Sequence, residues 1–242
     1  MLGNSKLFYD LKEKNIMNAD EQLLLFKIVN EYKNSKNLNK LYEILTKTKR
    51  KSITEIGVEA QPLTYRVGEG NTYLDLAMGS IKQRGNTESG IELDLNKEEQ
   101  DFVFCEAKWK SDLSSGVSKC SIRNQLQRVI ENALVFAGKE FRGKIFVTLI
   151  TPEFYKKHYE LGLNTRFYSC KYAEYKSNIK GSFLRELNLI EDFIPLKNIQ
   201  NKDIIKENLN KLFLNWITFE ELMENSSSQL KIIYDEINKK NK

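Results

Sequence analysis

The chain has little of the residue types on which many catalytic sites depend. Its 242 residues include one histidine, His158, which lies in the polar run Tyr155-Lys156-Lys157-His158 and is expected at the surface. Histidine is the usual general base of hydrolytic triads and a frequent metal ligand. Its scarcity therefore disfavours serine and cysteine hydrolases with a histidine base, and also histidine-dependent nucleases and phosphoesterases.

Cysteine, proline and glycine are scarce as well. The three cysteines, Cys105, Cys120 and Cys170, are widely spaced and form no Cys-X-X-Cys pair, which argues against a structural zinc site. With only 12 glycines and 3 prolines, the composition is that of an ordered globular chain. The glycines form neither a P-loop nor a dinucleotide-binding signature, so no nucleotide cofactor is predicted.

Long apolar runs are also missing. No segment reaches the roughly 18–20 continuous apolar residues of a membrane span, and the first residues, Met-Leu-Gly-Asn-Ser-Lys, lack the apolar core of a signal peptide. We therefore expect a cytoplasmic protein with no membrane partner. The formal net charge of +5 and the isoelectric point near 8.9 suit a polyanionic partner such as nucleic acid.

What the chain does have is a pair of apolar runs that carry charge where a buried strand normally has none. The first run contains Glu92-Leu93-Asp94-Leu95, and the second contains Phe104-Cys105-Glu106-Ala107-Lys108. Side chains alternate along a strand, so Glu106 and Lys108 share one face. If the two strands pair, two carboxylates and an ammonium group meet at the sheet. Metal-dependent phosphodiester cleavage requires such a set of groups.

This pattern resembles the PD-(D/E)XK superfamily, the nucleases with the restriction-endonuclease-like fold. Its motif is an acidic residue on one strand, followed by Glu-X-Lys on the next. Here Asp94 stands for the first acid and Glu106-Ala107-Lys108 for the second element, although the proline that usually precedes the acid is absent. The resemblance covers roughly residues 50–150. Four acid-X-Lys triplets occur in the chain, and only this one has both an apolar strand around it and an acid-bearing strand before it.

The resemblance implies an α/β fold with an αβββαβ core, a mixed central sheet and helical additions at both ends. Hydrophobic periodicity agrees with it, because it predicts strands over 72–81, 92–95, 102–109 and 144–150 and a helix over 121–137. The first core helix would lie at 38–50 or near 52–59, and 163–176 could add a strand. We expect an N-terminal helical segment over 1–50, a nuclease core over 51–180 and a C-terminal helical extension over 181–242.

The resemblance also implies a cofactor and a reaction. Asp94, Glu106 and the backbone carbonyl of Ala107 would bind Mg²⁺ or Mn²⁺, and Lys108 would orient the attacking hydroxide and stabilise developing charge. The enzyme would be a Mg²⁺-dependent endonuclease that leaves 5′-phosphate and 3′-hydroxyl ends, with DNA favoured over RNA as its partner. Both a monomer and a homodimer stay open. The alternative function is a non-catalytic nucleic-acid-binding or assembly protein that retains the nuclease fold.

The identity of the first acid has a second candidate. Asp75 lies on the preceding predicted strand and competes with Asp94 for this role. The short connection over 96–101 predicts a tight hairpin, and tight hairpins pair neighbouring strands directly. We therefore favour Asp94 and expect its carboxylate within about 5 Å of a Glu106 oxygen, since one metal ion with bonds of roughly 2.0–2.6 Å spans that distance.

Two accessory roles follow from the resemblance. Members of the superfamily often have a metal-shell glutamate on the first core helix, for which Glu59 is preferred and Glu55 is the alternative; four apart, they would share a helix face. Members with a recombination-nuclease-like core often have a glutamine on the helix after Glu-X-Lys. For this role Gln125 is preferred and Gln127 is the alternative.

Overall fold

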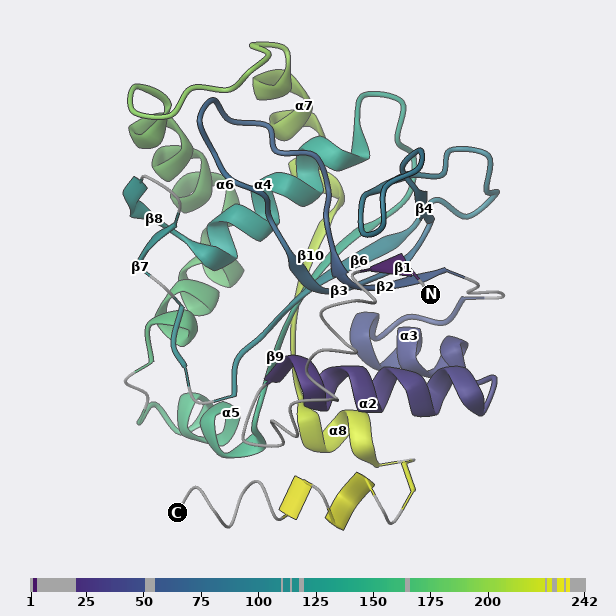
Figure 1. Cartoon of the computed structure of the whole chain (residues 1–242). Coiled ribbons are helices and arrows are strands. Elements are labelled where there is room, and N and C mark those ends of the chain that lie inside the picture. The colour runs from purple at the N-terminus through teal and green to yellow at the C-terminus, as the bar shows by residue number, and fades with distance from the viewer. Residues whose placement is uncertain are drawn as a thin grey trace.

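The computed structural model describes residues 2–3, 21–50, 55–109, 111–113, 115–117, 120–163, 166–224, 226–227, 230–232 and 234–235. They form an α/β structure in which helices cover both faces of a central sheet (Figure 1). The strands are β1 (Leu2–Gly3), β2 (Ile56–Ala60), β3 (Leu74–Gly79), β4 (Ile81–Gln83), β5 (Ile91–Leu93), β6 (Phe102–Ala107), β7 (Ser115–Val117), β8 (Cys120–Asn124), β9 (Ile145–Thr151) and β10 (Leu212–Thr218). The helices are α2 (Glu21–Asn34), α3 (Leu38–Thr46), α4 (Gln125–Ala137), α5 (Glu153–Glu160), α6 (Phe167–Glu191), α7 (Asn201–Asn208), the 3₁₀ turn η1 (Leu209–Lys211) and α8 (Phe219–Met223).

The central sheet has six strands in the order β1-β2-β3-β6-β9-β10. Strands β2, β3 and β6 form an antiparallel meander, whereas β9 runs parallel to β6 and β10 runs parallel to β9. Parallel neighbours need a long crossover, and α4 lies in the one between β6 and β9. The predicted α/β class with a mixed sheet is therefore confirmed, as are a helix within 38–50, the helix predicted over 121–137 and the strand predicted over 144–150.

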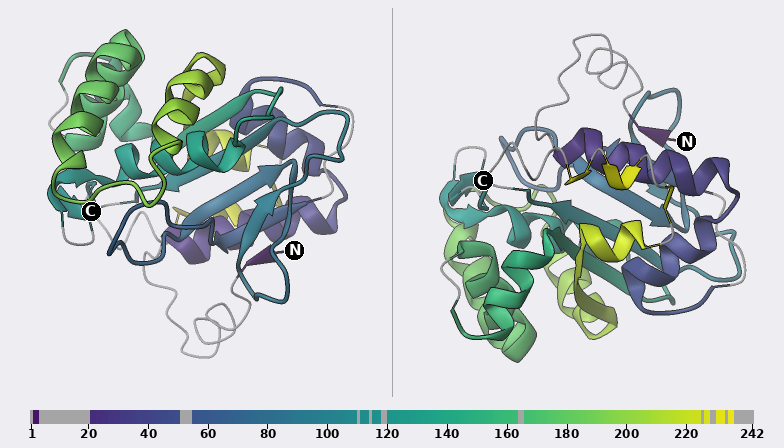
Figure 2. Two further views of the ribbon diagram at one scale, coloured as in Figure 1. Left: turned by 90° about the horizontal axis from the view of Figure 1, so that it is seen from above. Right: turned by 90° about the horizontal axis from the view of Figure 1, so that it is seen from below.

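Alternating side chains of the sheet divide the interior into two apolar cores. On β6, Phe102 and Phe104 pack in the core that contains α4, while Val103 and Cys105 pack in the core that contains α2 and α3. The two views in Figure 2 show α4, α6 and α7 over one face of the sheet and α2, α3 and α8 over the other. Strand β6 is therefore held between two packed layers.

The strand of Glu92 and Leu93 does not pair with β6, contrary to the prediction. Strand β5 pairs with β4 in a separate two-stranded ribbon, and the neighbours of β6 are β3 and β9. The reason is that the chain bends back at Ser80, directly after β3, and forms a local hairpin before it re-enters the sheet at Phe102. Local hairpin pairing thus separates the Asp94 region from the Glu106 strand.

Of the two positions left open for the first core helix, 38–50 contains α3, whereas residues 56–60 of the other form β2. Two further predictions about elements are wrong: residues 167–176 belong to α6 rather than to a strand, and residues 212–218 of the predicted helical extension form β10. The run Leu212-Phe213-Leu214-Asn215-Trp216-Ile217-Thr218 is rich in β-branched and aromatic residues, which suits a strand at the side of β9. In the described part of the chain, no helix has the length and apolarity that a membrane crossing needs.

Candidate active site

Three acidic residues occupy one row across β2, β3 and β6. The register of β3 and β6 pairs Leu76 with Cys105, so Asp75 and Glu106 occupy the next opposed positions. On the other side of β3, the register with β2 places Glu59 opposite Asp75. Opposed residues of antiparallel strands project from the same face of the sheet. For Asp75 and Glu106 this is the face that Phe104 shares and that α4 covers.

Asp75 and the Glu106-Ala107-Lys108 triplet are joined by direct contacts. The backbone N–H of Ala107 donates to Asp75 Oδ2 at 2.6 Å, so the carboxylate takes the place of a backbone acceptor where the β3–β6 ladder ends. Lys108 Nζ lies 2.8 Å from Glu106 Oε1, and both residues are buried, with exposures of 5% and 4%. The structure thus brings Glu106, Ala107 and Lys108 together as predicted, and it adds Asp75.

The environment of Asp75 is unfavourable for its charge. Burial raises the pKa of the Asp75 carboxyl well above its ordinary value, and the nearby charge of Glu106 raises it further. The Lys108 ammonium and the Ala107 N–H oppose this rise, while Glu59 adds to it. Two carboxylates therefore lie close together, with one ammonium group to balance them. A cation bound between them would relieve their repulsion.

We expect Asp75→Asn to stabilise the metal-free protein at pH 7. The pKa of Asp75 is higher in the folded than in the unfolded protein, so the protonated carboxyl contributes to the stability of the fold. This contribution is complete below the ordinary pKa near 3.8, and it is lost as the pH rises through the raised pKa. The asparagine variant has no such dependence. Thermal unfolding in EDTA between pH 4 and 8 should therefore show a higher Tm for the variant at neutral pH, and convergence with the parent at low pH.

The half-exposed Asp94 supplies the matched control, and Asp94→Asn should leave this pH profile unchanged. A lower Tm for Asp75→Asn at pH 7 would mean that Asp75 is instead a stabilising ion-pair partner in the folded protein.

Glu59 lies on β2 and not on a helix, which corrects the predicted placement. Its side chain is buried, and its backbone φ of +53° lies in the left-handed region, where a non-glycine residue costs on the order of 1–2 kcal/mol. Backbone strain of this kind is concentrated at functional sites. The alternative, Glu55, precedes β2 at its other end, where its carbonyl accepts from the Gly79 N–H. The geometry therefore favours Glu59 over Glu55.

Asp94 lies at the far end of the sheet from Glu106, so its predicted contact with Glu106 is wrong. Its backbone N–H donates to the carbonyl of Ser80 at 3.0 Å, and its Oδ1 accepts from the Asn96 N–H at 3.2 Å. The Ser80 N–H in turn donates to the carbonyl of Asp101, immediately before β6 begins. Glu106 is at the opposite end of that strand. Asp94 therefore stabilises a turn. The position opposite Glu106, which was predicted for Asp94, is occupied by Asp75.

The first turn of α4 lies at the same end of β6 as Glu106. Phe136 in the last turn of α4 packs on Phe102 at the start of β6, with ring centroids 5.1 Å apart. Helix α4 therefore runs antiparallel to β6. Gln127 is fully buried, and neither atom of its side-chain amide has a hydrogen-bond partner among the described residues. Gln125 is only partly buried. An unsatisfied buried amide needs a water or a ligand, so the geometry favours Gln127 over Gln125 for the accessory role.

The donor set of this site fits a hard divalent cation. Among the described residues, no three histidine, cysteine, aspartate or glutamate side chains are grouped as a complete metal site. Mg²⁺ does not require one, because it usually binds through one or two carboxylates together with waters and substrate phosphate oxygens. Asp75 and Glu106 supply two carboxylates, and the Ala107 carbonyl belongs to the residue between Glu106 and Lys108.

Comparisons of this chain with protein-family models, with curated proteins and with solved structures give no match.

Proposed function

We propose that the protein is a metal-dependent nuclease of the restriction-endonuclease-like type, with Asp75 in place of Asp94 as the first acid. The observation that carries the proposal is the group formed by the partly buried Asp75 and the buried Glu106 and Lys108. A mutually repelling pair of carboxylates with little access to solvent costs folding free energy, so it is expected where a cation completes the group. The same reasoning disfavours the non-catalytic alternative, which would have no use for these charges.

The order of elements supports the proposed fold. Strands β2, β3 and β6, helix α4 and strand β9 follow one another in the chain as the βββαβ part of the resembled core, and α3 precedes them. The first acid lies on the central strand of the meander and Glu-X-Lys on its last strand. The β4–β5 ribbon is an insertion between these two strands, which explains the long spacing from Asp75 to Glu106.

The proposed site assigns one task to each side chain. Asp75 and Glu106, with the carbonyl of Ala107, would hold Mg²⁺ or Mn²⁺. The bound cation would supply Lewis-acid activation of water and of the phosphodiester. Lys108 donates to the attacking oxygen and stabilises negative charge on the phosphate in the transition state. Its contact with Glu106 orients its ammonium group before substrate binds. The products would be 5′-phosphate and 3′-hydroxyl ends.

The expected substrate is DNA, and the activity should depend on a divalent cation. Incubation with supercoiled, linear, single-stranded and branched DNA should give cleavage with Mg²⁺ or Mn²⁺ and none with EDTA. Ligation of the products without prior phosphorylation would establish the 5′-phosphate ends. Cleavage that persists in EDTA, or no cleavage of DNA or RNA under any of these conditions, would refute the proposal.

A further inference from the structure

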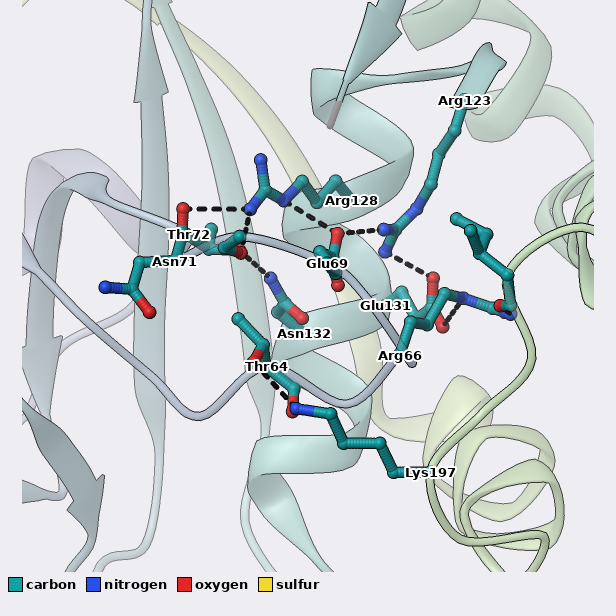
Figure 3. A network of polar contacts seen from close by, with 12 residues as sticks. Thr64, Arg66, Glu69, Asn71, Thr72, Arg123, Arg128, Glu131, Asn132 and Lys197 are labelled. Atoms are coloured by element: carbon teal, nitrogen blue, oxygen red, sulfur yellow. Dashed lines mark hydrogen bonds and ion pairs between the residues drawn. The ribbon is translucent and has the colours of Figure 1, made fainter. Parts of the chain in front are cut away.

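Six charged residues form an unbranched chain of ion pairs beside the candidate active site. Figure 3 shows the part of this chain from Arg66 to Arg128. Positive and negative side chains alternate along it, and every nitrogen–oxygen distance is 3.0 Å or less. The members, in order, are Glu191, Arg66, Glu131, Arg123, Glu69 and Arg128. Buried ion pairs add little to stability, but they define one arrangement of the segments that they join.

The chain of ion pairs joins α4 to the connection over residues 61–73 between β2 and β3, and it also includes Arg123 of β8 and Glu191 at the end of α6. Arg128 in the first turns of α4 pairs with Glu69 at 3.0 Å, and its Nη2 donates to the carbonyls of Gly70 at 2.8 Å and Asn71 at 2.9 Å. A single guanidinium group therefore holds three consecutive residues of the connection. Figure 3 shows these contacts converging on Arg128.

The connection over 61–73 links the two acid-bearing strands. It leaves β2 two residues after Glu59 and enters β3 just before Asp75. Arg128 lies in the first turns of α4, at the same end of β6 as Glu106. Burial lowers its pKa, and the negative charges of Glu69 and Glu106 oppose this lowering. The residue that anchors the entry to β3 thus lies at the same end of the sheet as the other half of the site.

We propose that Arg128 is a positioning residue: it anchors residues 69–71 on α4 and thereby sets the Asp75 carboxylate opposite Glu106. The inference rests on the proposed metal-binding function of these two acids. Arginine suits this role, because its rigid fork forms an ion pair with a carboxylate and donates to two carbonyls at once, which the single ammonium group of lysine cannot reproduce.

Positioning and direct electrostatics predict opposite effects of removing Arg128. If Arg128 acted only as a nearby positive charge, its loss would strengthen the binding of a cation at Asp75 and Glu106. If it positions Asp75, its loss should weaken Mn²⁺ binding by about 10-fold to 100-fold, as is typical when a residue that orients a metal ligand is replaced. The direction of the change in Kd therefore separates the two roles.

The test compares the parent, Arg128→Gln, Arg128→Lys and Lys197→Met in the full chain. Lys197 is a matched control, because its Nζ anchors the same connection at Thr64, with distances of 2.9 and 3.0 Å, away from Arg128. Two quantities are measured: the Kd for Mn²⁺, and the hydrogen-exchange rate of the Ala107 amide relative to the other amides of β6. The Ala107 amide reports on Asp75 directly, because it donates to Asp75 Oδ2.

We expect a higher Kd and faster Ala107 exchange in Arg128→Gln, smaller changes in Arg128→Lys, and neither change in Lys197→Met. If Arg128→Gln does not fold, Arg128→Lys carries the same test. A Kd that is unchanged or lower, with unchanged Ala107 exchange, would overturn the positioning role. Should the parent bind no Mn²⁺, the proposed function fails, and Ala107 exchange alone then decides whether Arg128 positions Asp75.

Discussion

Replacing Lys108 with methionine is expected to abolish DNA cleavage and to leave DNA binding in place. The Lys108 ammonium is held 2.8 Å from Glu106 in a buried setting, where a charge acts more strongly than it does in water. Removing one preorganised donor from a reacting centre typically lowers kcat by about 100-fold to 1,000-fold. Single-turnover cleavage and equilibrium DNA binding, measured on the same preparation, would show whether the loss lies in the chemical step.

The control must account for stability, because this substitution leaves Glu106 buried without its ammonium partner. Breaking a buried pair costs roughly 3–5 kcal/mol, so the assay belongs at a temperature where circular dichroism shows the variant to be folded. Methionine preserves most of the apolar stem of lysine. Lys82→Met is the matched variant, since Lys82 pairs with Glu92 at 3.1 Å on an exposed strand pair and should keep full activity. Cleavage at the parent rate by Lys108→Met would make Lys108 a structural residue.

Replacing Asp75 with asparagine is expected to remove both Mn²⁺ binding and cleavage, whereas Asp94→Asn should retain both. Asp75 lies opposite Glu106 across the paired strands β3 and β6, and its carboxylate accepts a hydrogen bond from the N–H of Ala107, the residue after Glu106. An asparagine carbonyl can still accept this bond but has no negative charge, so the local geometry is kept while the affinity for a divalent cation falls. Among the contacts that the structure gives, Asp94 has partners only in its own turn region, at Ser80, Asn96 and Lys97.

The two variants can be compared directly, because each replaces an aspartate with asparagine and so removes the same formal charge. Any effect of net charge on DNA binding should therefore be similar in both. A retained activity in Asp75→Asn together with a lost activity in Asp94→Asn would restore Asp94 as the first acid and would place the reacting centre elsewhere.

From the sequence it could be predicted that Glu106 and Lys108 lie together on one buried segment, but not which acid lies opposite Glu106. Glu106 and Lys108 stand out because charged residues two apart interrupt an otherwise apolar strand, and that signal is local. The partner acid depends on which strand lies beside β6, which is a non-local property. The residues between β3 and β6 pair with each other as the β4–β5 ribbon, so the acid nearest in sequence is not the nearest in space.

A signal for Asp75 was nevertheless present. The stretch Leu74-Asp75-Leu76-Ala77-Met78 is as apolar as β6, and a lone acid in a buried strand requires a partner or a function. The ion-pair chain had no comparable signal. Its members Arg66, Glu69, Arg123 and Glu131 resemble ordinary surface charges in the sequence, and only tertiary packing brings them together. Strand β10 was missed because helical periodicity on both sides of it masked a short strand-forming run.

The most direct test of the proposed site is a titration of Mn²⁺, followed by electron paramagnetic resonance, into the metal-free parent, Asp75→Asn and Asp94→Asn. We predict that the parent binds Mn²⁺ weakly, that Asp94→Asn binds it equally well, and that Asp75→Asn does not bind it. Binding by Asp75→Asn that equals binding by the parent would contradict the assignment of Asp75 and Glu106 as the carboxylate pair that holds the cation.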